Sequence, residues 1–432
     1  MNRLILAVCT VLLAPVALGE TVAVVGGDVL TVGPAGRIAG ATVVITDGLI
    51  TAVGADVKVP ADARVIDAKG KLVTPGLFTP FGTLGLVEVG SSAGPVDSVQ
   101  RGNQFAASFT VADAFNPRST LIAINRIEGV TRALIAPGGS SADALGNRSH
   151  VISGLAAVAN LSGTAASIDK RDAALVVNLG EKGVAFAGSS RASALLELRH
   201  ALVEAIDYQA HGDAYELGAH ADYVYSTTDL AVLGRVINGE IPLLAKVDRA
   251  SDIERLLDLA DEFKIRTIVH GGVESWMVAK RLAAARVPVI LAPENNLPAN
   301  FDRINARSDL AAELYAAGVK IAFADGSGST HNARNITQSA GNATVGGLPW
   351  DAALRAITLN PAEIYGVADR LGSIEVGKQG DIVVWPGDPF ELTVYPDAVL
   401  IRGQVQAMKS RQTLLRDRYL EADTSKPPAW RH

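Results

Sequence analysis

The chain has 432 residues, enough for two or three domains of ordinary size or for one large barrel with a smaller companion. Hydrophobic residues make up 48% and charged residues 19%, so the body of the chain is predicted to fold rather than stay disordered. The formal net charge is −6 and no basic stripe alternates with aromatic residues, which argues against a nucleic-acid-binding protein.

The first 19 residues have the pattern of an export signal. Arg3 supplies a positive charge, residues 4–13 form an apolar run, and Ala17 and Gly19 are the small residues that precede a cleavage site. The apolar run is short for a membrane anchor, so we expect an exported, periplasmic protein without a membrane span in its mature chain. The single cysteine, Cys9, lies within this run, so the mature chain would have no disulfide and no Cys zinc site.

Residues 20–72 are predicted to form part of a β-domain. Short runs rich in β-branched residues are separated by glycine-containing turns, a pattern typical of hairpins. The runs lie at 21–25, 41–45 and 49–53, and the turns at Gly26-Gly27-Asp28 and Asp47-Gly48. No helical period occurs in this part of the chain.

Residues 73–370 alternate between strand and helix patterns, which predicts βα units around a parallel sheet. The clearest segments are a strand at 241–246, a helix from an N-cap at Ser251 to Phe263, a strand at 265–270, a helix at 274–285, a strand at 287–291, a helix at 308–317 and a strand at 319–324. The length of this alternation favours a closed barrel, and no nucleotide-binding fingerprint or phosphate loop suggests an open sheet instead.

Residues 371–405 return to β-structure, and residues 406–432 form a tail with a helical stretch near 412–420. The late strands can complete the β-domain begun at residue 20. The sequence therefore predicts an α/β fold, a (β/α)8 TIM-like barrel with a small composite β-sandwich domain formed from both termini.

Three segments carry a family resemblance: Val73-Thr74-Pro75-Gly76-Leu77, Leu359-Asn360-Pro361-Ala362, and the longer run from Arg370 to Val384 that contains Gly372-Ser373-Ile374-Glu375-Val376-Gly377-Lys378. They resemble signatures of the amidohydrolase superfamily, and within it most of all the imidazolonepropionase-like group. Gly129-Val130-Thr131 also fits this family's early barrel. The resemblance covers about residues 20–405 and implies a barrel hydrolase of amide-type C–N bonds that uses a divalent metal such as zinc.

The positions that correspond to the family's metal ligands are mostly occupied by other residues. The resemblance places a His-x-His pair where this chain has Phe81-Gly82-Thr83, and another histidine where it has Lys246. Phenylalanine has no ligand atom, and a protonated lysine repels a cation. His270 and Asp325 match the remaining expected ligands, and a catalytic zinc normally needs three protein ligands.

His270, Asp325 and Lys246 are the candidate catalytic residues, since each is predicted to end a barrel strand at the mouth. The first two are also the remaining metal candidates. Lys246 can take the place of the metal and pair with Asp325, or it can pair with the nearby acid Asp248. The family also uses a carboxylated lysine as a metal bridge, although Lys246 stands at a histidine position. The alternative for His270 is a packed histidine at a strand end, and for Asp325 a turn-closing carboxylate.

Asn295, His331 and Asn332 follow predicted strands and are candidates for substrate binding, with loop capping as the alternative. The other histidines show no spacing typical of metal ligands, so we expect them to be structural or exposed: His150, His200, His211 and His220.

Two functions follow from these residues. The first is an exported hydrolase that acts on a C–N bond of a small molecule, amide-type non-peptide or dipeptide, with a reduced site. The second is a metal-free pseudoenzyme that binds a small ligand or a partner at the barrel mouth. In neither case does the sequence indicate the substrate or the oligomeric state.

Overall fold

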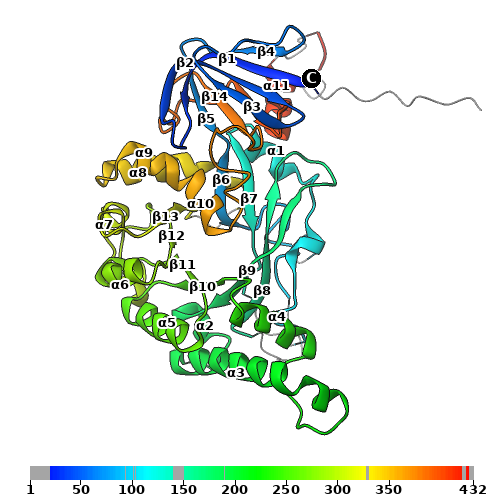
Figure 1. The fold of residues 1–432 in the computed structure, drawn as a ribbon, viewed down its shortest axis with the longest axis vertical. Coiled ribbons are helices and arrows are strands. Elements are labelled where there is room, and N and C mark those ends of the chain that lie inside the picture. The colour runs from blue at the N-terminus through cyan, green and yellow to red at the C-terminus, as the bar shows by residue number, and fades with distance from the viewer. Residues whose placement is uncertain are drawn as a thin grey trace, which may run out of the picture.

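The structure, a computed structural model, describes residues 20–92, 94–100, 102, 104–139, 150–188, 190–326, 330–420 and 425–427. The expected export signal lies outside the described residues. Within them, no helix is both long enough and apolar enough to cross a bilayer. Two sheets organise the chain, one at the top and one in the middle of the view in Figure 1.

The first sheet is built from both ends of the described chain. Its strands follow the order β16-β15-β14-β5-β1-β2-β3, and β4 pairs with β1 in addition. They are β1 (Thr21–Leu30), β2 (Arg37–Thr46), β3 (Leu49–Gly54), β4 (Arg64–Asp67), β5 (Leu72–Pro75), β14 (Ile382–Trp385), β15 (Ala398–Ile401) and β16 (Gln404–Val405). Strand β14 pairs antiparallel with both β5 and β15, so the late strands continue the sheet begun by the early ones. The predicted composite β-domain is confirmed.

Glycines form a tight turn at one place in this sheet and a bulge at another. Asp47 and Gly48 have φ angles of 52° and 80° and join β2 to β3, which confirms the predicted Asp-Gly hairpin. The turn predicted at Gly26-Gly27-Asp28 is wrong, because β1 continues through these residues to Leu30. Its register against β2 shifts there and Gly26 has a φ of 76°, so the glycines form a bulge within one strand.

The second sheet forms a nearly closed barrel in the order β13-β12-β11-β10-β9-β8-β7-β6. Its strands are β6 (Leu77–Gly82), β7 (Val130–Ile135), β8 (Ile152–Asn160), β9 (Ile168–Asn178), β10 (Leu243–Val247), β11 (Thr267–Gly271), β12 (Val289–Leu291) and β13 (Ile321–Phe323). The TIM-like barrel is confirmed with one departure. Strand β8 runs antiparallel to both β7 and β9, so this wall is a meander rather than two βα units.

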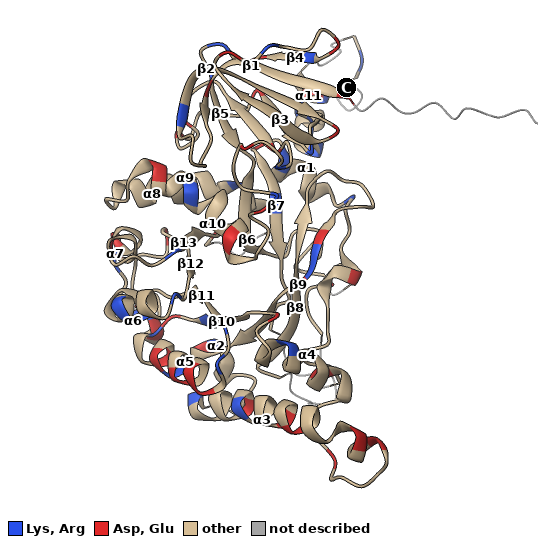
Figure 2. Cartoon of the chain, in the orientation of Figure 1, with Lys and Arg blue, Asp and Glu red and all other residues tan. Residues whose placement is uncertain are grey.

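Helices follow the parallel strands of the second half. In chain order, the helical segments are η1 (Val111–Ala114), α1 (Thr120–Arg126), α2 (Gly180–Val184), α3 (Arg191–Glu216), α4 (Thr227–Ile237), α5 (Ala250–Phe263), η2 (Ser275–Val278), α6 (Ala279–Ala284), η3 (Phe301–Arg303), α7 (Leu310–Ala316), η4 (Thr330–Asn335), α8 (Ile336–Val345), α9 (Trp350–Ala356), α10 (Leu359–Ile364) and α11 (Arg411–Leu420). Figure 2 shows acidic and basic residues intermixed along α3 and α5.

The predicted N-cap at Ser251 is wrong by two residues. Helix α5 begins at Ala250 after the cap residue Arg249, which makes no side-chain cap. The backbone N–H of Ala250 instead donates to Glu274 Oε2 at 3.1 Å. A carboxylate from a neighbouring segment thus supplies the acceptor that a local serine was expected to provide.

The family-like motifs lie where the barrel meets the β-domain. Close steric contacts and hydrogen bonds explain which residue types occur there. A Cβ on Gly76 would lie 2.2 Å from Thr131 Oγ1, so no larger residue fits between β5 and β6. A Cβ on Gly129 would meet the ring of Trp385 at 2.9 Å. Asn360 donates from Nδ2 to the backbone oxygen of Ile321 at 2.7 Å, which ties α10 to β13.

A buried ion network crosses the same junction. Arg132 on β7 is almost fully buried, with Nε 2.8 Å from Asp169 Oδ2 and Nη2 2.9 Å from Asp381 Oδ2. The Nε contact is an ion pair outside hydrogen-bond geometry, whereas Nη2 also donates to Gln379 Oε1 at 2.6 Å. Asp169 additionally pairs with Arg402. The network therefore links two barrel strands to the C-terminal part of the β-domain.

We expect Arg132→Met to lower the free energy of unfolding by about 3–5 kcal/mol, because it leaves Asp381 and part of Asp169 as buried, uncompensated carboxylates. Burial already raises the pKa of Asp381 against the opposing effect of Arg132. Removing the guanidinium raises that pKa further, so the deficit should shrink as the pH falls and these carboxyl groups take up protons. Urea denaturation across pH values measures both effects.

The matched control is Arg171→Met, since Arg171 pairs with Asp113 on the surface with both side chains more than half exposed. Its expected cost is below about 1 kcal/mol at every pH. If the two variants lost the same free energy of unfolding, the buried network would not be what stabilises the junction.

Candidate active site

A cavity of about 770 Å³ opens at the carboxyl ends of the barrel strands. Its walls come from the ends of β6, β10, β11, β12 and β13 and from the segments that follow them. Active sites of (β/α) barrels occupy this end, because several strand ends converge there. The cavity therefore lies where the sequence predicted a site.

Three side chains from β6, β10 and β11 meet in the cavity. The rings of Phe81 and His270 lie with centroids 4.1 Å apart and planes tilted by 40°. Lys246 Nζ lies over the Phe81 ring, 4.7 Å from its centroid. Lys246 and His270 are register partners on the parallel strands β10 and β11, so their side chains leave the sheet at the same level.

Lys246 carries a strongly perturbed ammonium group. Burial lowers the pKa of Lys246 to about 8, and the positive charge of Lys182 lowers it as well. Within the described residues, no carboxylate raises this pKa or forms an ion pair with Nζ. The Phe81 ring face is the favourable contact that the ammonium makes, through a cation–π interaction.

His270 is held in its neutral form. Burial lowers the pKa of His270 well below its ordinary value, and the charges of Lys246, Lys182 and Arg303 lower it further. A neutral imidazole in a buried pocket has one nitrogen that can accept a proton. The cluster of positive charge around it favours an anionic group in the cavity.

The nearby acid Asp248 does not pair with Lys246. Its Oδ2 accepts a hydrogen bond from Arg303 Nε at 2.9 Å, and the same oxygen lies 2.9 Å from Arg303 Nη2. Its Oδ1 has no hydrogen-bond partner among the described residues and faces Gly271, where an added Cβ would approach within 2.3 Å. The Asp248–Arg303 pair thus forms one polar wall of the cavity.

Asp325 and Asn295 both line the cavity, as expected from their places after β13 and β12. Lys246 and Asp325 line the same cavity, and the replacement of a metal by this pair stays a prediction. His331 is exposed, and neither His331 nor Asn332 belongs to the described lining. Both lie in η4, whose turn carries Thr330 and Ala333 toward the cavity instead.

Sequence reasoning missed Thr79, Arg303 and Lys182. Thr79 is fully buried, lines the cavity, and its Oγ1 has no hydrogen-bond partner among the described residues. It stands two residues before Phe81 on β6, so the two-residue period of a strand places both on one face and could have revealed it. Arg303 and Lys182 lie on helical segments after the strands, and no local motif marks them.

The comparisons with known proteins agree with this geometry. The sequence profile of the amidohydrolase family matches residues 244–406, a span that contains Lys246, His270 and Asp325. A crystal structure of an amidohydrolase from Thermotoga maritima MSB8 covers 90% of this chain and 100% of its own, with a TM-score of 0.79 and 25% identity. Over residues 244–406, the chain is similar to the amidohydrolase family.

Two other proteins are also similar to this chain. The amidohydrolase tasK of Hapsidospora irregularis is 25% identical over 392 residues, which cover 84% of this chain and 39% of that protein. This chain therefore spans less than half the length of that relative. A prolidase crystallised with N-methylphosphonate-L-proline has the same fold, with a TM-score of 0.55, 17% identity and coverage of 90% and 100%.

We expect the side chain of Lys246 to titrate with a midpoint near pH 8 rather than near the ordinary value of about 10.4. NMR of protein labelled at lysine Cε measures this midpoint, and loss of the resonance in Lys246→Met assigns it. Lys182→Met should raise the midpoint, because it removes a positive charge that acts on Lys246.

Lys320→Met serves as the control, since Lys320 pairs with Glu363 at 2.8 Å and lines a separate cavity away from the strand carboxyl ends. It should leave the Lys246 midpoint unchanged. A midpoint above about 10 in the wild type would contradict the buried, uncompensated ammonium.

Proposed function

We propose that this protein is an exported hydrolase of the amidohydrolase family that acts on an amide-type C–N bond of a small molecule, non-peptide or dipeptide, within the barrel-mouth cavity. The observation that carries the proposal is the juxtaposition of buried Lys246 and His270 at the strand carboxyl ends. Strongly perturbed ionisable groups that share a cavity are typical of catalytic sites. Export is supported by the signal-like pattern of residues 1–19.

The residues in the cavity do not fit the family's divalent metal. Phe81 covers one side of His270 at a position where a ligand is expected, and it has no donor atom. Lys246 brings a positive charge to the same place. Among the described residues, His270 and Asp325 are not joined by a third His, Cys, Asp or Glu close enough to share an ion. We therefore propose that the reaction proceeds without a metal at these positions.

The remaining groups suggest how this cavity would treat an amide. No carboxylate among the described residues pairs with the Lys246 ammonium, so it can pair with a carboxylate of the substrate or with the oxygen that becomes negative during attack. The neutral His270 can accept a proton from water, or Asp325, which lines the same cavity, can do so. The apolar wall around Phe81 excludes water from the rest of the substrate.

A second candidate is a pseudoenzyme that binds a small anionic ligand without turnover. The observation that favours it is the Phe81–His270 contact, since a ring with its centroid 4.1 Å away restricts the imidazole. This reading keeps the same cavity and the same role for Lys246. It differs in predicting saturable binding with no cleavage product.

We expect purified mature protein to hydrolyse members of a panel of N-acyl amino acids and dipeptides at a rate that a chelator does not change. Lys246→Met and His270→Ala should each lower kcat/KM at least about 100-fold, because each removes charge stabilisation or proton transfer. His331→Ala is the control, since this exposed residue lies outside the described lining. Binding of the same compounds by calorimetry without any product would favour the pseudoenzyme instead.

Restoring the expected ligands tests the metal part of the proposal separately. The triple variant Phe81→His, Thr83→His, Lys246→His should gain zinc in the barrel, because it supplies imidazoles beside His270 and Asp325. The gain is measured by elemental analysis against the wild type, and adding His270→Ala to the triple variant should weaken it. Tight zinc in the wild type that is lost in His270→Ala would overturn the metal-free reading.

A further inference from the structure

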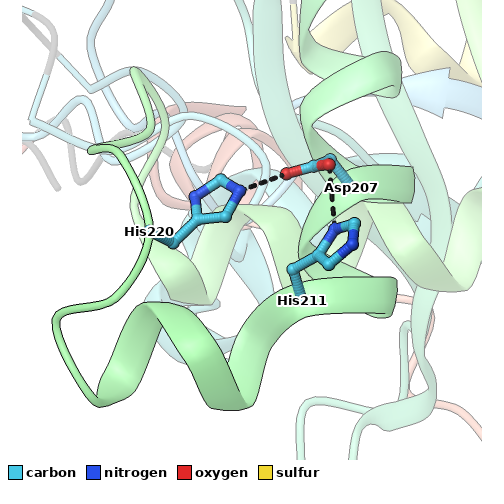
Figure 3. Close-up of side chains that lie close together, drawn as sticks. All are labelled: Asp207, His211 and His220. Atoms are coloured by element: carbon cyan, nitrogen blue, oxygen red, sulfur yellow. Dashed lines mark hydrogen bonds and ion pairs between the residues drawn. The ribbon is translucent and has the colours of Figure 1, made fainter.

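A second cluster of ionisable side chains lies far from the barrel cavity, at the C-terminal end of α3. Asp207 and His211 are one turn apart on α3, and His220 lies in the segment that returns after the helix ends (Figure 3). Both imidazole rings point toward the carboxylate between them. His211 and His220 show no ligand spacing in the sequence, and the chain reversal after α3 brings their rings together around Asp207.

The ligand atoms in this cluster have the spacing of a metal site. His211 Nδ1 is 3.0 Å from Asp207 Oδ1, and His220 Nε2 is 3.1 Å from Asp207 Oδ2. One ligand atom from each residue falls within 4.8 Å of the other two. Zinc bonds of about 2.0–2.1 Å in tetrahedral geometry place ligand atoms about 3.3–3.4 Å apart, so only small adjustments would admit the ion.

The hydrogen bonds of His220 require an additional positive charge at its Nε2. Its Nδ1 lies 2.9 Å from the backbone oxygen of Ala221, so Nδ1 carries the proton that it donates there. A neutral imidazole has one N–H, which leaves a bare lone pair on Nε2 directed at the carboxylate of Asp207. Two lone pairs at 3.1 Å repel each other unless a proton or a metal ion lies between them.

Tyr223 holds the Asp207 carboxylate in place, as the residues behind metal ligands do in metal sites. Tyr223 donates from its hydroxyl to Asp207 Oδ2 at 2.8 Å, and its ring stacks on His220 with centroids 5.0 Å apart. Backbone and hydroxyl partners that orient ligand side chains are a regular feature of metal sites. The side chains of Asp207, His211 and His220 are 37%, 55% and 27% exposed, so an ion can reach them from solvent.

We propose that Asp207, His211 and His220 form a binding site for a zinc-class divalent transition metal, separate from the barrel cavity. Two imidazoles and one carboxylate suit Zn²⁺ better than Mg²⁺ or Ca²⁺, which prefer all-oxygen sites. Three protein ligands leave a fourth position for water or for a donor from another molecule. The bound ion clamps the segment after α3 onto the end of that helix.

The test uses the mature full-length chain without an affinity tag, titrated with Zn²⁺ by calorimetry and with Co²⁺ by visible absorption. We expect one ion per chain with a tetrahedral Co²⁺ spectrum. His211→Ala and His220→Ala should each weaken binding at least about 100-fold, since each removes one of three ligands. Tyr223→Phe should weaken it about 10-fold, because it loosens the carboxylate without removing a ligand.

Two controls separate this site from other histidines. His200→Ala removes an exposed histidine of the same helix, whose Nε2 is 3.7 Å from Glu204, and it should leave binding unchanged. His270→Ala should also leave it unchanged, since that residue lies in the barrel cavity. Circular dichroism and denaturation without metal check that every variant folds.

Wild-type affinity in both His211→Ala and His220→Ala would overturn the proposal. Loss of the ion in His270→Ala alone would also overturn it and would place the metal in the barrel. Retained stoichiometric binding in His200→Ala and His270→Ala, with loss in the two ligand variants, would establish the site whether or not the barrel has hydrolase activity.

Discussion

The buried guanidinium of Arg132 couples the two sheets of this protein, and much of the architecture is arranged around that contact. It lies against Asp169 from β9 and Asp381 from the segment before β14, so strands distant in the sequence depend on one charge centre. Ions placed so deeply are tolerated only when every charge has a partner. The close approach at Gly76 and the Asn360 hydrogen bond to Ile321 fix the same junction from the barrel side.

This arrangement gives the family-like motifs a structural role at the junction of the two sheets. The motif residues near Pro75, Asn360 and Asp381 serve the joint between barrel and β-domain, and none of them needs a metal to do so. Phe81, Lys246 and His270 stand at strand ends above the joint, where side chains can change without altering the frame. The residues that join the two sheets are thus different from those that line the cavity.

The sequence predicted the features that depend on local pattern. The Asp47-Gly48 hairpin, the strands at β10 to β13 and the places of Lys246 and His270 near strand ends follow from turn chemistry and periodicity. It did not predict that β8 runs antiparallel, because a buried apolar strand has the same composition in either direction.

Other errors came from contacts between segments. The start of α5 is set by Glu274, a residue that no local capping rule includes. The outward position of His331 depends on the turn of η4, and the Asp207, His211 and His220 cluster depends on a chain reversal. The spacing of four residues between Asp207 and His211, which lie one turn apart on α3, is the local signal of that cluster in the sequence.

The pairing of β5 with β14 has a consequence for how the chain is made. These strands stand at opposite ends of the barrel sequence, so the β-domain cannot close until nearly the whole chain has been synthesised. Before then, β5 presents unpaired backbone groups along one edge, the kind of surface that recruits strands from other molecules. Contacts of such long sequence separation also form slowly. Any product that ends before Ile382 would lack β14, so the edge of β5 would stay unpaired and exposed.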